Sequence, residues 1–315
     1  MAYACPGFLV RYLNANGDTM SMRTGLVAIV LGIIISSCEK TINFKPNDSE
    51  PELVVEASIE NGQPPIVILS QSLNYFNQIS TELLANSFVH NAEITISTGN
   101  RSHRLKELTV PVAGGYTLYY YTTDSTSLST AITGELGKEY SLSIRTDARE
   151  YSASTTIPLL SKQIDSLWWI DAPNNPDPKK VVVMGRFVDP PGLGNYTRYF
   201  TSVDGWPFMP GLNSVYDDQL TDGTTYNMQI EQGVDRNKQY NLENYAFFEH
   251  SDSVVVKYCN IDKATYDFWR TMEYSYTNIG NPFAAPSKVI SNIHGGGLGY
   301  FGGYAVQYKA IGIPN

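Results

Sequence analysis

Residue types that commonly catalyse reactions or hold metals are scattered through this 315-residue sequence. None of its histidines stands in the HExxH spacing that would place two imidazoles and a general base on one helix. No GxSxG motif offers a nucleophilic serine on a sharp turn. Residues 217–223 are rich in Asp, whose hard oxygen ligands suit Ca²⁺, but such loops are usually solvated turns. We therefore expect no catalytic residue, no resident metal and no cofactor.

One cysteine does indicate covalent chemistry. Arg23 precedes a run of eleven mostly apolar residues, 25–35. Two serines follow this run, and Cys38 comes directly after them. A basic start, a short apolar run and small residues before a cleavage point are typical of a secretory signal, and a cysteine placed there is typical of a lipoprotein. The run is shorter than the roughly 20 apolar residues that a membrane span needs. We predict that residues 1–37 are a leader and signal peptide that is removed, and that Cys38 carries lipid.

The region around the signal has two further features. A signal peptide begins close to the N-terminus, yet 19 residues without a pattern precede Met20. We therefore expect translation to begin at Met20 or Met22. Residues 38–50 are polar and aperiodic, which favours a tether between the lipid and the folded body. Ile42 and Phe44 alternate with polar residues, so an edge strand is the alternative for this segment.

Charge and cysteine content limit the partners and the cross-links. The formal net charge of −9 argues against a nucleic-acid partner and against electrostatic docking on anionic lipid. Membrane attachment would then depend on the lipid at Cys38. Cys5 lies in the leader, so Cys259 would be the one thiol left in the mature body, and no internal disulfide is expected. The mature chain is long enough to rely on its own hydrophobic core.

The elements that must position any site are predicted to be mainly β. Residues 51–160 contain short period-two runs separated by turn residues, a spacing that favours an immunoglobulin-like β-sandwich. A short helix is expected within residues 79–90. Residues 161–315 predict a second β-rich domain with one helix near residues 262–276. Asp262 can cap this helix, and its apolar residues recur at three- and four-residue spacing.

Aromatic residues are the most unusual part of the composition, with 22 tyrosines in the chain. Aromatic side chains on strands usually pack across the sheet, whereas apolar side chains on a loop need another surface to cover them. The loop of residues 205–210 (GWPFMP) is therefore the strongest interface candidate. The full set of candidate interface residues is Trp206, Phe208, Tyr216, Tyr300 and Phe301.

Several sequence marks, spread over essentially the whole mature chain, resemble one family. They are residues 53–57 (LVVEA), 59–65 (IENGQPP), 187–192 (FVDPPG), 195–196 (NY), 281–283 (NPF), 291–293 (SNI) and 298–304 (LGYFGGY). In this order they resemble outer-membrane lipoproteins of Bacteroidota that carry a domain of unknown function. The resemblance implies a lipoprotein often encoded beside a TonB-dependent receptor, and it implies no catalytic residue.

Three short motifs also resemble the O-glycosylation pattern of exported Bacteroidota proteins. In each of them an Asp is followed by a Ser and then by Thr, Leu or Val. The predicted acceptors are Ser125, Ser166 and Ser253. Asp-Ser pairs are also ordinary turn formers, which is the alternative interpretation.

These observations predict an interaction protein rather than an enzyme. The first hypothesis is a lipid-anchored, non-catalytic accessory subunit of an outer-membrane β-barrel, namely a TonB-dependent transporter. The alternative is a lipoprotein that binds glycans or peptides by itself, and a hydrolase is the least favoured. The residues after Cys38, Glu39 and Lys40, carry one acid and one base, so both the periplasmic and the cell-surface face of the outer membrane stay open.

Overall fold

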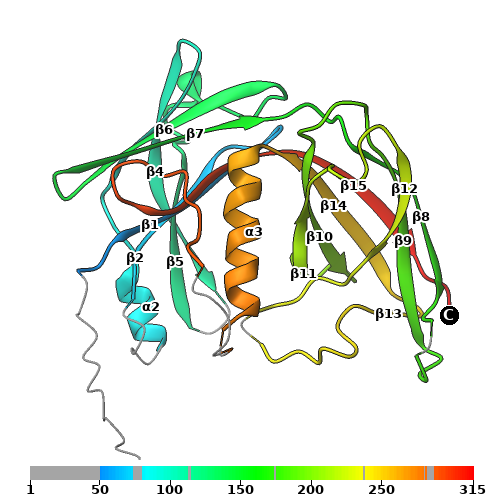
Figure 1. The fold of residues 1–315 in the computed structure, drawn as a ribbon. Coiled ribbons are helices and arrows are strands. Elements are labelled where there is room, and N and C mark those ends of the chain that lie inside the picture. The colour runs from blue at the N-terminus through cyan, green and yellow to red at the C-terminus, as the bar shows by residue number, and fades with distance from the viewer. Residues whose placement is uncertain are drawn as a thin grey trace, which may run out of the picture. The chain divides into compact units, whose positions relative to one another are not determined.

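The computed structural model describes residues 50–73, 80–112, 115–173, 175–236, 238–279, 281 and 287–315 (Figure 1). The predicted leader and signal peptide, Cys38 and the tether up to residue 49 lie outside the described residues. Ser49–Asn315 forms one compact unit. The described part is mainly β, with two sheets and two α-helices, which confirms the mainly β prediction. No helix in this part of the chain is long and apolar enough to cross a membrane.

An eleven-stranded sheet forms most of the unit, in the order β11-β10-β14-β15-β1-β2-β5-β4-β3-β6-β7. β1 and β15 pair in parallel, and the other neighbours in this sheet are antiparallel. The strands are β1 (Leu53–Glu60), β2 (Ile66–Gln71), β3 (Glu93–Thr98), β4 (Arg101–Val112), β5 (Tyr116–Thr123), β6 (Lys138–Thr146), β7 (Arg149–Ile157), β10 (Tyr196–Val203), β11 (Met209–Tyr216), β14 (Ser253–Ile261) and β15 (Leu298–Gly312).

A four-stranded sheet is built around β9 (Lys180–Val188). Its other strands are β8 (Gln163–Asp171), β12 (Thr225–Ile230) and β13 (Phe248–Glu249), each paired with β9. The predicted domain boundary at residues 160 and 161 falls between β7 and β8. The large sheet takes strands from both sides of that boundary, because β15 pairs with β1, so the segments 51–160 and 161–315 share one sheet.

The two α-helices lie where the sequence pattern predicts them. α2 (Thr81–Ser87) falls within residues 79–90, and α3 (Lys263–Thr277) begins and ends one residue after the predicted range. Asp262 caps α3 by accepting a hydrogen bond from the backbone N–H of Thr265 at 2.8 Å. Its second carboxylate oxygen accepts from the Thr155 hydroxyl at 2.7 Å, which connects the start of α3 to β7.

Alternate side chains of β1 and β15 point to opposite faces of the large sheet, which we call the inner face and the outer face. The inner face carries Val55 and Phe301, which join the first hydrophobic core with residues of β2, β3, β6 and β7. The outer face carries Glu56 and Tyr300, which lie opposite each other in the β1–β15 register. α3 packs against the outer face, where Phe268 stacks on Tyr300 with ring centroids 4.6 Å apart (Figure 1).

The smaller sheet packs on β10 and β14 and encloses a second core. This region holds an ion pair between Lys162 and Asp189, whose side chains are both 0% exposed, with Nζ 2.7 Å from Oδ2. The Thr221 hydroxyl donates to the same carboxylate at 2.7 Å and accepts from Lys162 at 3.1 Å. Such hydrogen bonds offset part of the cost of removing both charges from water.

Candidate functional site

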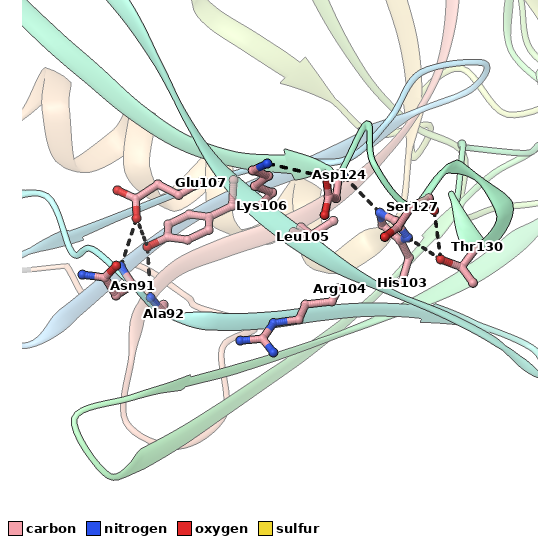
Figure 2. Close-up of a pocket in the computed structure, with 11 residues that line it drawn as sticks. Asn91, Ala92, His103, Arg104, Leu105, Lys106, Glu107, Asp124, Ser127 and Thr130 are labelled. Atoms are coloured by element: carbon pink, nitrogen blue, oxygen red, sulfur yellow. Dashed lines mark hydrogen bonds and ion pairs between the residues drawn. The ribbon is translucent and has the colours of Figure 1, made fainter.

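A polar pocket of about 590 Å³ opens beside β4 and β5 (Figure 2). At one end of it the Glu107 carboxylate accepts a hydrogen bond from the Asn91 N–H at 3.0 Å, and it lies 3.2 Å from the Tyr121 hydroxyl. The same hydroxyl contacts the Val89 carbonyl oxygen and the Ala92 N–H. Burial, together with the neighbouring Glu107 carboxylate, raises the pKa of Tyr121 to about 12, so this phenol stays protonated at neutral pH.

The other end of the polar pocket is organised around His103 (Figure 2). The backbone N–H of Asp124 donates to Nε2 of His103 at 3.1 Å, and Nδ1 lies 2.8 Å from the Thr130 hydroxyl. Because Nε2 accepts this bond, Nδ1 is placed to donate to the Thr130 hydroxyl. Both ring nitrogens are therefore used to fix the loop after β5, as expected of a structural histidine.

The second cavity, which we call the α3 groove, lies on the outer face between α3 and the first residues of β1 and β15. Its volume is about 470 Å³. Met272 and Leu298 are 38% and 41% exposed there, so apolar side chains remain open to solvent. The lining residues are Val54, Val55, Glu56, Phe268, Trp269, Met272, Lys288, Val289, Ser291, Leu298, Gly299 and Tyr300.

A buried cation holds one wall of the α3 groove in place. The Arg198 guanidinium carbon lies 3.5 Å from the centre of the Trp269 ring, a cation–π contact. Arg198 also donates to the Ser214 hydroxyl at 3.1 Å and to the Tyr304 hydroxyl at 3.2 Å. The Trp269 indole N–H donates to Tyr304 at 3.1 Å. These contacts fix the orientation of the Trp269 ring within the protein itself.

Glu273, one helical turn after Trp269, attaches α3 to β11. Its carboxylate accepts from the Ser214 backbone N–H at 2.9 Å and from Arg236 at 3.2 Å. The side chain is 4% exposed, so these bonds replace water around a buried charge. This attachment keeps the helix face that lines the α3 groove at a defined distance from the sheet.

Glu56 is the one carboxylate among the residues that line the α3 groove. Its side chain reaches solvent, and within the described residues it forms no hydrogen bond or ion pair. Desolvation by the surrounding protein raises the pKa of Glu56, and the nearby Arg198 charge offsets only part of this effect. The groove therefore combines an apolar lining with an acid that lacks a partner.

We expect Glu56→Gln to stabilise the protein increasingly as the pH rises. The folded state holds the Glu56 proton more tightly than the unfolded state, whose pKa is near 4.5, so this residue costs stability once the pH rises through its folded pKa. The melting temperature of the variant, relative to wild type, should rise as the pH is raised from about 4 to about 7. Glu52→Gln, on an exposed glutamate outside the groove, is the control. A constant difference across this pH range would contradict the prediction.

The predicted interface residues occupy different environments. Trp206 follows a turn in which Asp204 and Gly205 have positive φ angles of 50° and 78°, and its side chain is 72% exposed. Phe208 packs on Tyr308 with ring centroids 5.7 Å apart, and the two are 38% and 57% exposed. We call Trp206, Phe208 and Tyr308 the aromatic edge.

The other three predicted interface residues face the interior. Tyr216 is half-buried and stacks on Tyr199 with ring centroids 6.0 Å apart. Tyr300 and Phe301, predicted as possible interface residues, are 5% and 0% exposed, so neither side chain is open to a partner in this structure. Consecutive strand residues point to opposite faces, but here α3 covers Tyr300 and the first core covers Phe301.

Of the three predicted glycosylation sites, Ser125 lies in a turn, Ser253 begins β14 and Ser166 lies within β8. Ser125 and Ser253 are exposed, whereas Ser166 is half-buried beside Asp165, so glycosylation at these serines stays a prediction. In the Asp-rich loop, burial opposes ionisation of Asp218, but the N–H groups of Asn195 and Gly194 hold its pKa below the usual value. Asp218 therefore organises a turn. Among the described residues, no three His, Cys, Asp or Glu side chains are placed to hold a metal.

The sequence-based candidates do not include Glu56 or Arg198. Both residues interrupt strands whose neighbours are apolar or aromatic, LVVEASIE and YTRYFTSV. A charge in the middle of such a run must be exposed, paired or functional, and that signal could have identified both.

Comparison with known proteins adds one positive finding. No curated protein matches this chain. The family described as domain of unknown function (DUF4249) matches residues 39–310, which include both α-helices and all strands except the last two residues of β15. The chain therefore belongs to the DUF4249 family.

Proposed function

We propose that the protein is a lipid-anchored accessory subunit of an outer-membrane β-barrel, a TonB-dependent transporter. The predicted signal peptide directly before Cys38 supports a lipid anchor at this cysteine. The resemblance to outer-membrane lipoproteins of Bacteroidota supports a TonB-dependent transporter as the partner. In this proposal the protein binds and does not catalyse. The lipid holds the body at the membrane surface, and a surface of the body contacts the transporter.

The aromatic edge is the observation that carries this proposal. Trp206, Phe208 and Tyr308 come from two segments about 100 residues apart and expose large apolar surfaces together. Trp and Tyr are enriched among the residues that dominate protein–protein binding energy, because they bury a large area at low entropic cost. Trp206 follows the turn at Asp204 and Gly205, whereas Tyr308 projects from β15.

Affinity purification from detergent-solubilised outer membranes tests the proposal. The wild-type protein should recover a TonB-dependent β-barrel, identified by mass spectrometry. The triple variant Trp206→Ser, Phe208→Ser, Tyr308→Ser should recover at least about tenfold less of it, since two or more contact residues of this kind are lost. The matched control is Leu193→Ser with Leu220→Ser, which removes side chains that are 71% and 96% exposed elsewhere.

Two results would contradict the proposal. Equal recovery of the barrel by the triple variant would exclude the aromatic edge as the contact surface. Recovery of the lipoprotein without any barrel would favour a protein that binds glycans or peptides by itself, and binding screens with those ligands would follow.

A further inference from the structure

The α3 groove has the physical character of a small-molecule site. Its volume of about 470 Å³ falls in the range typical of ligand pockets, which are mostly apolar and contain a few placed polar groups. Trp269, Met272 and Leu298 supply apolar surface from α3 and β15. Arg198 already fixes the Trp269 ring, so binding would not have to order this wall.

Charge decides what kind of ligand fits. Glu56 lies among apolar lining residues and, in the described part of the chain, has no polar partner. The charged or titratable groups around it are Arg198, Lys288 and Tyr300. Arg198 directs its hydrogen bonds to Ser214 and Tyr304, and Lys288 is exposed on the lining without an ion pair to Glu56.

Glu56 is exposed on the groove lining, so a cation that enters the groove can reach its carboxylate and form a charge-assisted hydrogen bond with it. An anionic ligand would add a second negative charge to the groove, and a neutral apolar ligand would leave Glu56 unpaired. A ligand with one cationic group and an apolar remainder would satisfy both parts of the lining at once.

We propose that the α3 groove binds a small ligand with an apolar body and a single ammonium or guanidinium group, with the Glu56 carboxylate as its counter-ion. The apolar body packs against Trp269, Met272 and Leu298. This inference does not depend on the proposed transporter partner, because the groove and the aromatic edge share no residue.

Calorimetric titration with three probes of equal chain length tests the inference: octylamine, octanol and octanoate at neutral pH. The chain is produced as its Cys38→Ser variant, so that no acyl chain or detergent competes for the groove. Octylamine should bind at least about tenfold more tightly than octanol, and octanoate more weakly than either, because only the amine pairs with Glu56. Lowering the pH to about 4 should weaken octylamine binding as Glu56 becomes protonated.

Substitutions separate the two parts of the site. Glu56→Gln should weaken octylamine about tenfold and leave octanol within about twofold, whereas Met272→Ser should weaken both. Glu52→Gln should change neither. Equal affinity for octylamine and octanol, an equal loss for both probes in Glu56→Gln, or no saturable binding would overturn the proposal. Dimerisation of the free protein that Met272→Ser abolishes would overturn it too, because a second copy would then cover the groove.

Discussion

Asp189→Leu is expected to lower the free energy of unfolding by about 3–5 kcal/mol. The substitution leaves the Lys162 ammonium buried without its counter-charge, in a region where both side chains are 0% exposed. The Thr221 hydroxyl alone cannot replace a carboxylate as the partner of an ammonium group. Urea denaturation at neutral pH, followed by circular dichroism, measures the effect.

Two controls distinguish lost charge pairing from lost packing. The double variant Lys162→Met, Asp189→Leu removes both charges and should recover most of the stability, since apolar residues of similar volume often replace a buried ion pair without loss. Glu150→Leu breaks the pair with Arg145, in which the two side chains are 69% and 59% exposed, and should leave the stability nearly unchanged. A double variant as unstable as Asp189→Leu would show that the ion pair is not the cause.

Gly299→Ala is expected to cost about 3 kcal/mol or more. Gly299 has a φ of +94°, and a Cβ built there would lie 1.9 Å from the Val55 carbonyl oxygen of the neighbouring strand. The clash falls within the parallel β1–β15 pairing, where Val55 and Gly299 are register partners. Backbone strain and overpacking therefore act together. Thermal and urea unfolding of the purified variant measure the loss.

Two other glycines provide the comparison for Gly299. Gly296 also has a positive φ, of +87°, but no atom lies within 4 Å of its built Cβ, so Gly296→Ala measures the backbone strain alone. Gly312, at the end of β15, has neither constraint, and Gly312→Ala should change stability by less than about 1 kcal/mol. If Gly299→Ala cost no more than Gly296→Ala, the contact with Val55 would be unimportant.

Local patterns in the sequence predict the local structure of this protein well. The α3 helix follows from its capping aspartate and from apolar residues at three- and four-residue spacing, which place one face against the sheet. Strands such as β3 and β6 follow from strict alternation, because one face of each is buried in the first core.

The arrangement of those elements depends on contacts between distant residues, which local patterns do not contain. The series of short period-two strands ends with β7 at Pro158, and this pattern predicts a domain boundary there. Whether strands on the two sides share a sheet depends on the pairing of β1 with β15, which no local signal specifies. The same limit applies to the α3 groove, whose walls come from β1, α3 and β15.

The parallel pairing of the first and last strands also has consequences for how the chain folds. Asn61 accepts a hydrogen bond from the backbone N–H of Val306, across 245 residues of sequence. β15 lies between β1 and β14, so the large sheet cannot be completed until the C-terminal residues have been synthesised. Folding should therefore be slow, as high contact order predicts. Until then the edges of β1 and β14 that pair with β15 stay unpaired, and such edges favour aggregation. Under the proposed export of the protein, such a delay would keep the chain unfolded during its passage across the inner membrane.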